Sequence, residues 1–583
     1  MTDTQKEKRV KYLSTGIKDL DDILSPDREI VDDDPGGILF GDAESRKQWE
    51  TPIVIIEGTT GTGKTNMALQ IAHAAARDKE CVVLFYSLEQ SVVALSKASE
   101  NFGFFQSKEE SSPDVSYIDM SLPEQVPDQF RPDEARIHFC KFSPRPLNAN
   151  RENEIFEQRI AELEEALSIT NLDENKESIF VFIIDGITAF AGKPLQRNEV
   201  YKIFSLFRQY KVPAIITSER YSNENTDQDS AFHEATKFLA DIVISLSKET
   251  PLGHLLYYLE IIKSRVGRQA LGKHLYKIRT EANALGIKTD TRKGIVVYPS
   301  IHYVLSRVRA RSSKESIDNN AQKKDPEPYN LQQSKSTDLG LLLNAISIKS
   351  NSSISIVGAN GTHKLALALN FAMGSVKKET KMLLLNFGGT GQVNFNGVAW
   401  TKENQKWHLL ELQPNSAKMG EIKFWHQRYA IGLETDANPA NVYITSFKIG
   451  QLTPEECFDT IEYLLKKAKE NNQPFHSVVL NNTAEICTGF PYLKNESLFI
   501  PTLLYLFYVH NLVSVSIGVE NEKSTITDEM NFALQANADY RIVLSHYPSI
   551  EQISEYIVNP TKNRKGLKFD QQLFSLTRPS ILL

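Results

Sequence analysis

Residues 58–65 read Gly-Thr-Thr-Gly-Thr-Gly-Lys-Thr, which is a complete phosphate-binding loop of the form G-x-x-x-x-G-K-T. The apolar run Pro52 to Ile56 precedes this loop, and residues 66–76 after it are compatible with a helix. A strand, loop and helix in this order predict that backbone N–H groups of the loop surround the phosphates of a nucleoside triphosphate. A chance glycine-rich turn is disfavoured, because the loop and both flanking segments agree.

The nucleotide-binding residues expected from this motif are those of the loop and the first helical positions: Gly58, Thr59, Thr60, Gly61, Thr62, Gly63, Lys64, Thr65 and Asn66. The Lys64 ammonium would reach the β- and γ-phosphate oxygens, and the Thr65 hydroxyl would hold Mg²⁺. A nucleoside triphosphate and Mg²⁺ are therefore the expected ligands.

The length and composition indicate a soluble protein of several domains. A chain of 583 residues exceeds what one hydrophobic core supports, so two to four domains are expected. The net charge of −7 argues against a broadly basic surface for gripping nucleic acid. The four cysteines lack metal-ligand spacing, which favours buried, reduced thiols. No apolar stretch approaches the roughly 20 residues that span a bilayer, so a cytoplasmic location without membrane contact is expected.

Residues 309–337 form a polar segment with almost no apolar residues, and we predict a linker there. The halves that flank it, 1–308 and 338–583, each contain an apolar strand, a glycine-bearing loop, a helix and a second apolar strand. This pattern predicts an internal duplication. Strands that alternate with helices predict, for each half, an α/β domain with a largely parallel sheet flanked by helices.

Two carboxylates complete the expected first site. Asp185 ends the apolar run Ile179 to Ile184, where a carboxylate can support the Mg²⁺ shell. An aspartate at a strand end is also common as a turn or helix cap, but the phosphate loop favours the metal role. Glu89 follows the strand-like run Cys81 to Tyr86, where it could orient and polarise the attacking water.

The first half resembles the circadian-clock ATPase KaiC and its relatives, within the RecA and DnaB-helicase fold group. Besides the phosphate loop, the resemblance rests on segments in the family's order over roughly residues 10–300: Leu13–Leu24, Ser87–Gln90, Ile183–Ala189, Ile216–Arg220 and Ile262–Gly267. It implies two tandem RecA-like P-loop domains, ATP as the nucleotide and a homohexameric ring. It also implies that Lys263 and Arg265 enter the neighbouring subunit's site and stabilise transition-state charge. Outside the family context, two solvated charges at a strand end would be the simpler interpretation.

The sequence departs from this family at several positions. Family members carry two adjacent glutamates, whereas here Gln90 follows Glu89, so slow turnover is expected and the water-activating carboxylate is open. Residues 25–50 are longer than the family's short glycine-rich stretch, which predicts a surface insertion.

The second half keeps the outline of the first but not its chemistry. Its loop, residues 358–365, retains Lys364 but has His363 in place of a glycine and Leu365 in place of the metal-binding hydroxyl. Its next strand is followed by Asn-Phe-Gly-Gly with no glutamate, and Asn481 stands where an aspartate is expected. We therefore expect a pseudo-ATPase domain. A second K-x-R-like segment, Lys562 to Arg564, is either a basic turn or a group that reaches a neighbour.

Two classes of function follow. The first is a ring-forming ATPase that hydrolyses ATP in its first domain and regulates an unidentified protein partner. The alternative is a RecA- or DnaB-like nucleic-acid motor, whose basic loops line a channel. Residues 219–234, after the sensor-like strand, contain five carboxylates and one arginine, so we expect this loop to repel phosphate backbones. Lys193 and Arg197 permit only a weak contact, and nucleic acid is the less favoured partner.

Overall fold

The structure is a computed structural model. It describes residues 12–25, 37–39, 51–77, 81–102, 115–119, 135–141, 152–170, 179–191, 195–220, 227–265, 270, 272–279, 294–307, 351–358, 364–365, 368, 372, 381–387, 398–403, 406–411, 442–447, 450, 452–519, 533–534, 536–547, 555–563 and 572–575. The chain divides into two compact units: residues 1–285 with 291–303, and residues 286–290 with 304–583. The predicted linker 309–337 lies outside the described residues, and its boundaries stay a prediction.

The first unit is built on a ten-stranded sheet in the order β12-β11-β10-β9-β3-β8-β7-β4-β6-β5. The seven strands from β9 to β5 run parallel, and β10, β11 and β12 continue the sheet antiparallel. The strands of the unit are β1 (Tyr12–Leu13), β2 (Ile38–Leu39), β3 (Ile53–Gly58), β4 (Cys81–Ser87), β5 (Val115–Asp119), β6 (Ile137–Lys141), β7 (Ile179–Asp185), β8 (Ala214–Glu219), β9 (Ile242–Glu249), β10 (Leu256–Ser264), β11 (His274–Arg279) and β12 (Gly294–Tyr298).

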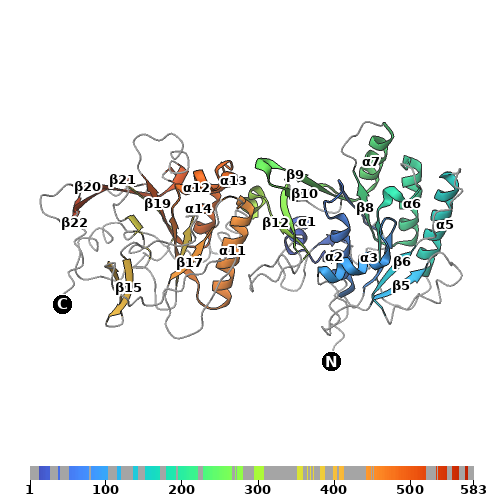
Figure 1. The fold of residues 1–583 in the computed structure, drawn as a ribbon, viewed down its shortest axis with the longest axis horizontal. Coiled ribbons are helices and arrows are strands. Elements are labelled where there is room, and N and C mark those ends of the chain that lie inside the picture. Colours follow the sequence, from blue (N-terminus) through green and yellow to red (C-terminus); the bar gives the residue numbers. More distant parts are fainter. Residues whose placement is uncertain are drawn as a thin grey trace, which may run out of the picture. The chain divides into compact units, whose positions relative to one another are not determined.

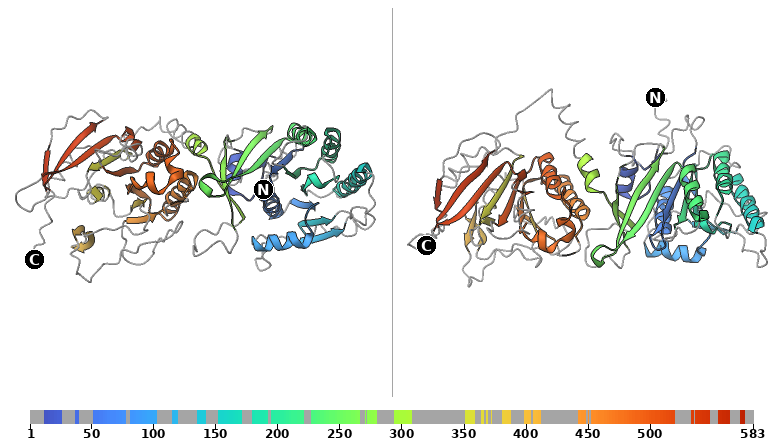
Figure 2. Two further views of the ribbon diagram at one scale, coloured as in Figure 1. Left: turned by 45° about the horizontal axis from the view of Figure 1, so that its top comes forward. Right: turned by 90° about the horizontal axis from the view of Figure 1, so that it is seen from above.

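Helices cover both faces of this sheet (Figures 1 and 2). The described helices are α1 (Lys18–Leu24), α2 (Lys64–Arg77), α3 (Val92–Asn101), α5 (Glu152–Ile169), α6 (Arg197–Tyr210) and α7 (Asp227–Leu239), with 3₁₀ turns at Ile187–Ala189 and Pro251–Gly253. The side chains of strand β3 show why helices are needed on both faces of the sheet. Its Val54 and Ile56 pack with α1, α2 and α3, whereas Ile53 and Ile55 pack with α5, α6 and α7. Because neighbouring residues of a strand point to opposite faces, a strand that is apolar throughout must be covered on both sides.

In this unit the structure shows regular elements in two segments that we expected to be loops. The segment that we expected to be an acidic loop, 219–234, is helical from Asp227 onward, because Phe232, Ala235 and Leu239 give α7 a buried apolar face. Residues 221–226 lie outside the described part. The insertion 25–50 contributes the short strand β2, which pairs with β1, and most of its other residues lie outside the described part.

The second unit has an eight-stranded sheet in the order β17-β14-β18-β19-β13-β20-β21-β22. Its strands are β13 (Ser353–Gly358), β14 (Lys381–Asn386), β17 (Val442–Ser446), β18 (Phe475–Asn481), β19 (Val513–Val519), β20 (Tyr540–Tyr547), β21 (Glu555–Asn563) and β22 (Gln572–Ser575), with a separate hairpin of β15 (Val398–Glu403) and β16 (Lys406–Glu411). Its described helices are α11 (Pro454–Glu470), α12 (Glu485–Gly489), α13 (Pro491–Lys494) and α14 (Phe499–Val509).

The two sheets have the same strand succession. Taken in the same direction, β17-β14-β18-β19-β13-β20-β21-β22 matches β6-β4-β7-β8-β3-β9-β10-β11 in chain order and in strand polarity. Detail is shared too: Asp241 Oδ2 accepts from Ile53 N at 3.0 Å, and Asp539 Oδ2 accepts from Ser353 N at 3.0 Å. The α/β fold of two tandem RecA-like domains and the internal duplication are therefore confirmed.

Two further expectations concern cysteines and membranes. Cys81, Cys140 and Cys457 are buried and carry free thiols, as predicted. Among the described residues, every helix is too short or too polar to cross a bilayer. The cytoplasmic location stays a prediction.

Candidate nucleotide site

The loop 58–65 lies at the carboxyl end of β3, in the middle of the first sheet. Gly58 is level with Glu219 on β8 and Leu246 on β9, and α2 begins at Lys64. Gly63 has a φ of +83°, a backbone conformation that favours glycine. The edge formed by the carboxyl ends of parallel strands is where ligands bind in sheets of this kind.

Lys64 is held over the loop. Its ammonium donates to Gly58 O at 2.9 Å and to Thr59 O at 3.1 Å. Burial lowers the pKa of Lys64, while the charges of Glu219, Glu89 and Asp185 act in the opposite direction. A cation beside backbone N–H groups at a helix start suits the phosphates of a nucleotide.

Asp185 and Thr65, the pair expected at the metal, are brought together. The Thr65 hydroxyl lies 2.9 and 3.1 Å from the two Asp185 carboxylate oxygens. Asp185 is only 1% exposed, and it also accepts from Thr217 at 2.8 Å and from Ser87 at 3.4 Å. Burial raises the pKa of Asp185, and these hydrogen bonds oppose that shift.

These donors fit Mg²⁺, which prefers hydroxyl, carboxylate, water and phosphate oxygens. In the described part of the chain no group of three or more His, Cys, Asp or Glu side chains surrounds a common point. The ion would therefore be held mainly by Thr65, water and phosphates, with Asp185 behind them. The roles of these two residues stay predictions.

Glu89 lies beside the same carboxylate. The backbone N–H of Leu88 donates to Asp185 O at 2.9 Å, which fixes the segment after β4 against the end of β7. Gly186, with φ of +87°, leaves room for Glu89, because a Cβ there would lie 2.6 Å from Glu89 Cγ. Loss of hydration, together with the charges of Asp185 and Glu219, raises the pKa of Glu89. A raised pKa makes this carboxylate a better proton acceptor.

Several residues around the loop were not singled out from the sequence. The Thr60 hydroxyl donates to Glu219, and Lys248 Nζ donates to Thr60 O at 3.0 Å. Tyr276 OH donates to Thr62 O at 2.5 Å. Lys248 and Tyr276 lie on β9 and β11, far from the loop in sequence, and no motif marks them. Asn66, which the motif did mark, lies in the first turn of α2.

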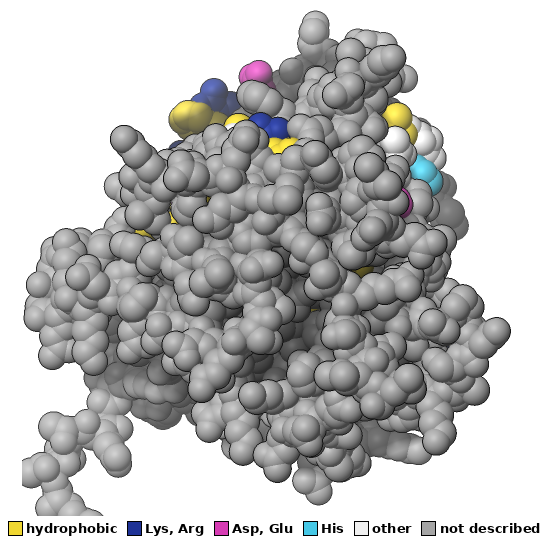
Figure 3. Space-filling model, turned by 90° about the vertical axis from the view of Figure 1, so that its left-hand side faces the viewer, with side chains coloured by type: hydrophobic (Ala, Val, Ile, Leu, Met, Phe, Trp, Pro, Cys, Tyr) yellow, Lys and Arg dark blue, Asp and Glu magenta, His cyan; other side chains and the backbone are white. Residues whose placement is uncertain are grey.

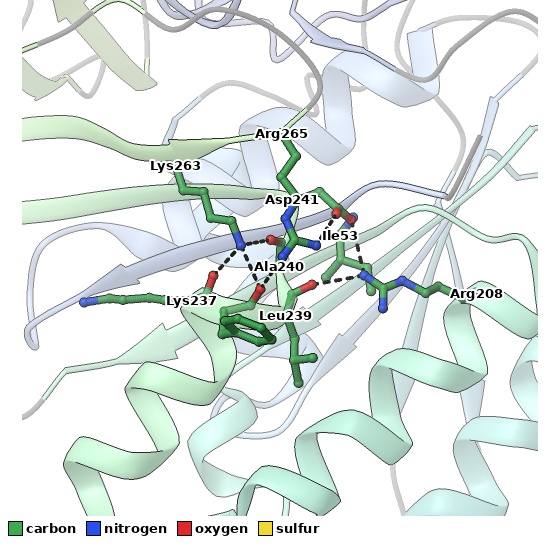
Figure 4. Close-up of polar contacts among 9 residues, drawn as sticks. Ile53, Arg208, Lys237, Leu239, Ala240, Asp241, Lys263 and Arg265 are labelled. Carbon is green, nitrogen blue, oxygen red and sulfur yellow. Dashed lines mark hydrogen bonds and ion pairs between the residues drawn. The ribbon is translucent and has the colours of Figure 1, made fainter.

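Lys263 and Arg265 lie on one side of the end of β10, as their spacing predicts (Figure 4). A bulge at Ile262 precedes them. The Lys263 ammonium donates to the carbonyls of Lys237, Phe238 and Ala240 at 2.7, 2.8 and 2.6 Å. Arg265 Nη2 donates to Phe238 O at 2.8 Å, and its side chain is 44% exposed. Both cations therefore bind the C-terminal end of α7.

The second unit retains one part of this arrangement. Lys364 Nζ donates to Gly358 O at 2.6 Å, as Lys64 does to Gly58, and burial lowers the pKa of Lys364 to about 8. Asn481, in the place of Asp185, donates to Asn386 Oδ1 at 3.1 Å. The loop residues between Gly358 and Lys364, including His363, lie outside the described residues.

The strand pairing places one of the two cations of the K-x-R-like segment in the second unit. Lys562 lies in β21 and pairs with Arg541, the second residue of β20. Lys263 pairs with the second residue of β9, and a register shift precedes both lysines. A strand end, not a basic turn, thus holds Lys562, while Arg564 lies outside the described residues.

The cations considered for a contact with nucleic acid are only partly described by the structure. On the face in Figure 3, a few described Lys and Arg side chains lie beside hydrophobic and acidic ones. Arg197, one of two cations considered for such a contact, lies over the Phe238 ring at 5.2 Å. Lys193 lies outside the described part.

A mostly parallel sheet with a phosphate loop after its central strand, and a buried aspartate on a nearby strand, defines a RecA-like P-loop ATPase domain. The comparison with protein families agrees, because the family model described as "ATPase: KaiC" matches residues 13–291. This part of the chain is therefore a domain of the KaiC ATPase family, as the resemblance predicted. No curated protein matches the chain.

Proposed function

We propose that the chain is a ring-forming ATPase that hydrolyses ATP in its first unit, at subunit boundaries, and uses its nucleotide state to regulate a protein partner or its own assembly. The observation that carries the ATPase proposal is the contact of Thr65 with the buried Asp185 beside a complete phosphate loop. A hydroxyl and a carboxylate in this position suit a nucleotide–metal complex.

Each group then has a defined task. Lys64 exchanges its two loop carbonyls for the β- and γ-phosphate oxygens of ATP. Thr65 and Asp185 would hold Mg²⁺, which would supply neutralisation of the phosphate charge. Glu89, with its raised pKa, orients a water molecule and accepts its proton.

The position of Arg265 supports a site shared between two copies of the chain. Arg265 N donates to Asp241 O, and Asp241 N donates to Ile53 O, so Arg265 is level with the first residue of β3. The loop begins at Gly58, the last residue of this six-residue strand, roughly 16 Å away. That distance exceeds the reach of an arginine side chain. The phosphates that Arg265 stabilises would therefore belong to a neighbouring copy, and Lys263, which donates to three carbonyls at the end of α7, would hold Arg265 in position.

A contact between one edge of a subunit and a different edge of the next is heterologous, and it closes into a ring when the rotation permits. The family resemblance suggests six members. We assign no turnover to the second unit, because Leu365 cannot bind Mg²⁺ and Asn481 carries no charge.

The test is steady-state ATP turnover of four chains: wild type, Lys64→Ala, Lys364→Ala and Arg265→Ala. Lys64→Ala should abolish turnover, Lys364→Ala should retain most of it, and Arg265→Ala should lower it by roughly 10³-fold. An equal mixture of the Lys64→Ala and Arg265→Ala chains should regain activity, because an intact loop can then meet an intact arginine.

Rings that contain both chains and stay inactive would refute the shared site. Turnover in Lys64→Ala that is lost in Lys364→Ala would refute the assignment of the active unit. Salt-sensitive stimulation of wild-type turnover by single- or double-stranded DNA would favour the nucleic-acid motor instead.

A further inference from the structure

The last turn of α7 lies against the side chains of Lys263 and Arg265, at the end of β10 (Figure 4). Its carbonyls at Lys237, Phe238 and Leu239 accept hydrogen bonds from Lys263, Arg265 and Arg208. Carbonyls at a helix C-terminus have no partner within the helix, and cations are favoured there. This turn therefore holds the side chains of Lys263 and Arg265 beyond the pairing of β10 with β9.

The same turn is joined to β3 by a buried ion pair. Lys237 Nζ lies 3.2 Å from Glu57 Oε1, and the Glu57 side chain is 1% exposed. Among the described residues no well-aligned hydrogen bond reaches either Glu57 oxygen, so Lys237 is its charge partner. A buried carboxylate depends strongly on such a partner, because the charge has lost its hydration.

Glu57 is the last residue before the loop glycine Gly58, and it is level with Ser218 on β8. The next residue of β8 is Glu219, which accepts a hydrogen bond from Thr60 of the loop. A rearrangement of the loop around phosphates would thus act directly on the backbone that carries Glu57. Lys237 links this backbone to the carbonyls that hold Lys263 and Arg265.

We propose that the Glu57–Lys237 ion pair is a coupling device: it transmits the state of one subunit's phosphate loop, through α7, to the Arg265 that serves the neighbouring subunit. Lys237 is then a positioning residue that acts on the neighbour's reaction and not on its own. This inference rests on the shared site proposed above. It deepens that proposal by naming the residues through which adjacent sites communicate.

The test places a neutralised pair, Glu57→Gln with Lys237→Met, on only one chain of a mixed ring. This double change removes the ion pair without leaving an unpaired buried charge. In a mixture of Lys64→Ala and Arg265→Ala chains, turnover occurs in the Arg265→Ala chain and uses the arginine of the Lys64→Ala chain. On the Lys64→Ala chain, the neutralised pair should lower this turnover roughly 3- to 30-fold, because the pair fixes the turn of α7 that holds Arg265 even when that chain's own loop binds no phosphate. On the Arg265→Ala chain, which supplies no arginine, it should leave turnover unchanged.

Two control variants separate coupling from general damage. The surface pair Lys273–Glu249, at 2.7 Å with side chains 53% and 45% exposed, is neutralised in the same way and should have no effect on either chain. Lys237→Arg, which keeps the charge, should restore most of the activity.

An equal loss on both chains, a loss only on the Arg265→Ala chain, or no loss would overturn the coupling. An inactive parent mixture would instead refute the shared site, and the coupling with it, so the two failures are distinguishable.

A second measurement does not depend on the folding of these variants. Wild-type chains are diluted until they are monomeric, and amide exchange is followed in residues 236–241 with and without a slowly hydrolysed ATP analogue. Coupling through the chain's own loop should change exchange by about threefold or more, and Lys64→Ala should abolish the change. Unchanged exchange in monomers that bind the analogue would overturn the proposal.

Discussion

Replacement of Lys263 by methionine should weaken the end of α7 more than it weakens catalysis. The lysine ammonium uses all three of its N–H donors on the carbonyls of Lys237, Phe238 and Ala240. A cation at a helix C-terminus stabilises it by about 0.3–1 kcal/mol when exposed and by up to about 2 kcal/mol when partly buried. Lys263 is partly buried, so we expect a loss of about 1.4 kcal/mol, which is tenfold in the local opening equilibrium.

Hydrogen exchange with residue resolution measures this opening. The reporter is the amide of Ala240, which donates to Thr236 O at 2.9 Å in the last turn of the helix. Exchange of this amide should become about tenfold faster in Lys263→Met and only slightly faster in Arg265→Ala, which loses one carbonyl contact. Lys273→Met, in an exposed ion pair on the same sheet, is the control and should leave it unchanged.

Turnover should show the opposite order. Arg265→Ala should reduce it by roughly 10³-fold, whereas Lys263→Met should reduce it by roughly tenfold, through a displaced Arg265. If Lys263→Met loses as much turnover as Arg265→Ala while Ala240 exchanges at the wild-type rate, Lys263 contacts the phosphates directly and the helix-end reasoning is wrong.

Two predictions concern pH. Burial raises the pKa of Asp21 to about 6, against the opposing hydrogen bonds of Ser14 and Thr15, so the folded state binds this proton more tightly than the unfolded state. This proton stabilises the folded state fully below about pH 4, and the stabilisation is lost as the pH rises to about 6. Urea titrations should therefore show the unfolding free energy of the wild type falling by about 3 kcal/mol across this window relative to Asp21→Asn. A difference between the two proteins that does not change with pH would contradict this. The acid limit of kcat/KM reports Glu89 in the free enzyme and should lie above its ordinary value, because only the deprotonated carboxylate accepts a proton. Glu219→Gln removes a like charge and should move that limit to lower pH, whereas an unmoved limit would exclude Glu89 as the titrating group.

The parts of the site that the sequence predicted are those in which chemistry depends on a local pattern. The phosphate loop, Asp185 and Glu89 each follow an apolar run, and parallel strands bring their carboxyl ends to one edge. Lys248 and Tyr276 were not predicted, because they reach the loop from β9 and β11 and depend on strand pairing.

Helix α7 was mistaken for a loop because its first four residues, Asp-Gln-Asp-Ser, are all polar. The apolar spacing of Phe232, Ala235 and Leu239 was the available signal. The contacts of Lys263 had no sequence signal, since they join a strand end to the end of a separate helix.

The second unit shows which features of the first belong to the scaffold. It has the same aspartate clamp, Asp539 on Ser353, and the same register shift before Lys562, yet Leu365 and Asn481 occupy the positions of Thr65 and Asp185. A clamp and a bulge that occur without Asp185 or Thr65 counterparts cannot by themselves indicate hydrolysis. They set the end of an antiparallel strand against its parallel neighbour. The argument for turnover in the first unit therefore depends on Thr65, Asp185 and Glu89, and the argument for a shared site depends on the distance of Arg265 from its own loop.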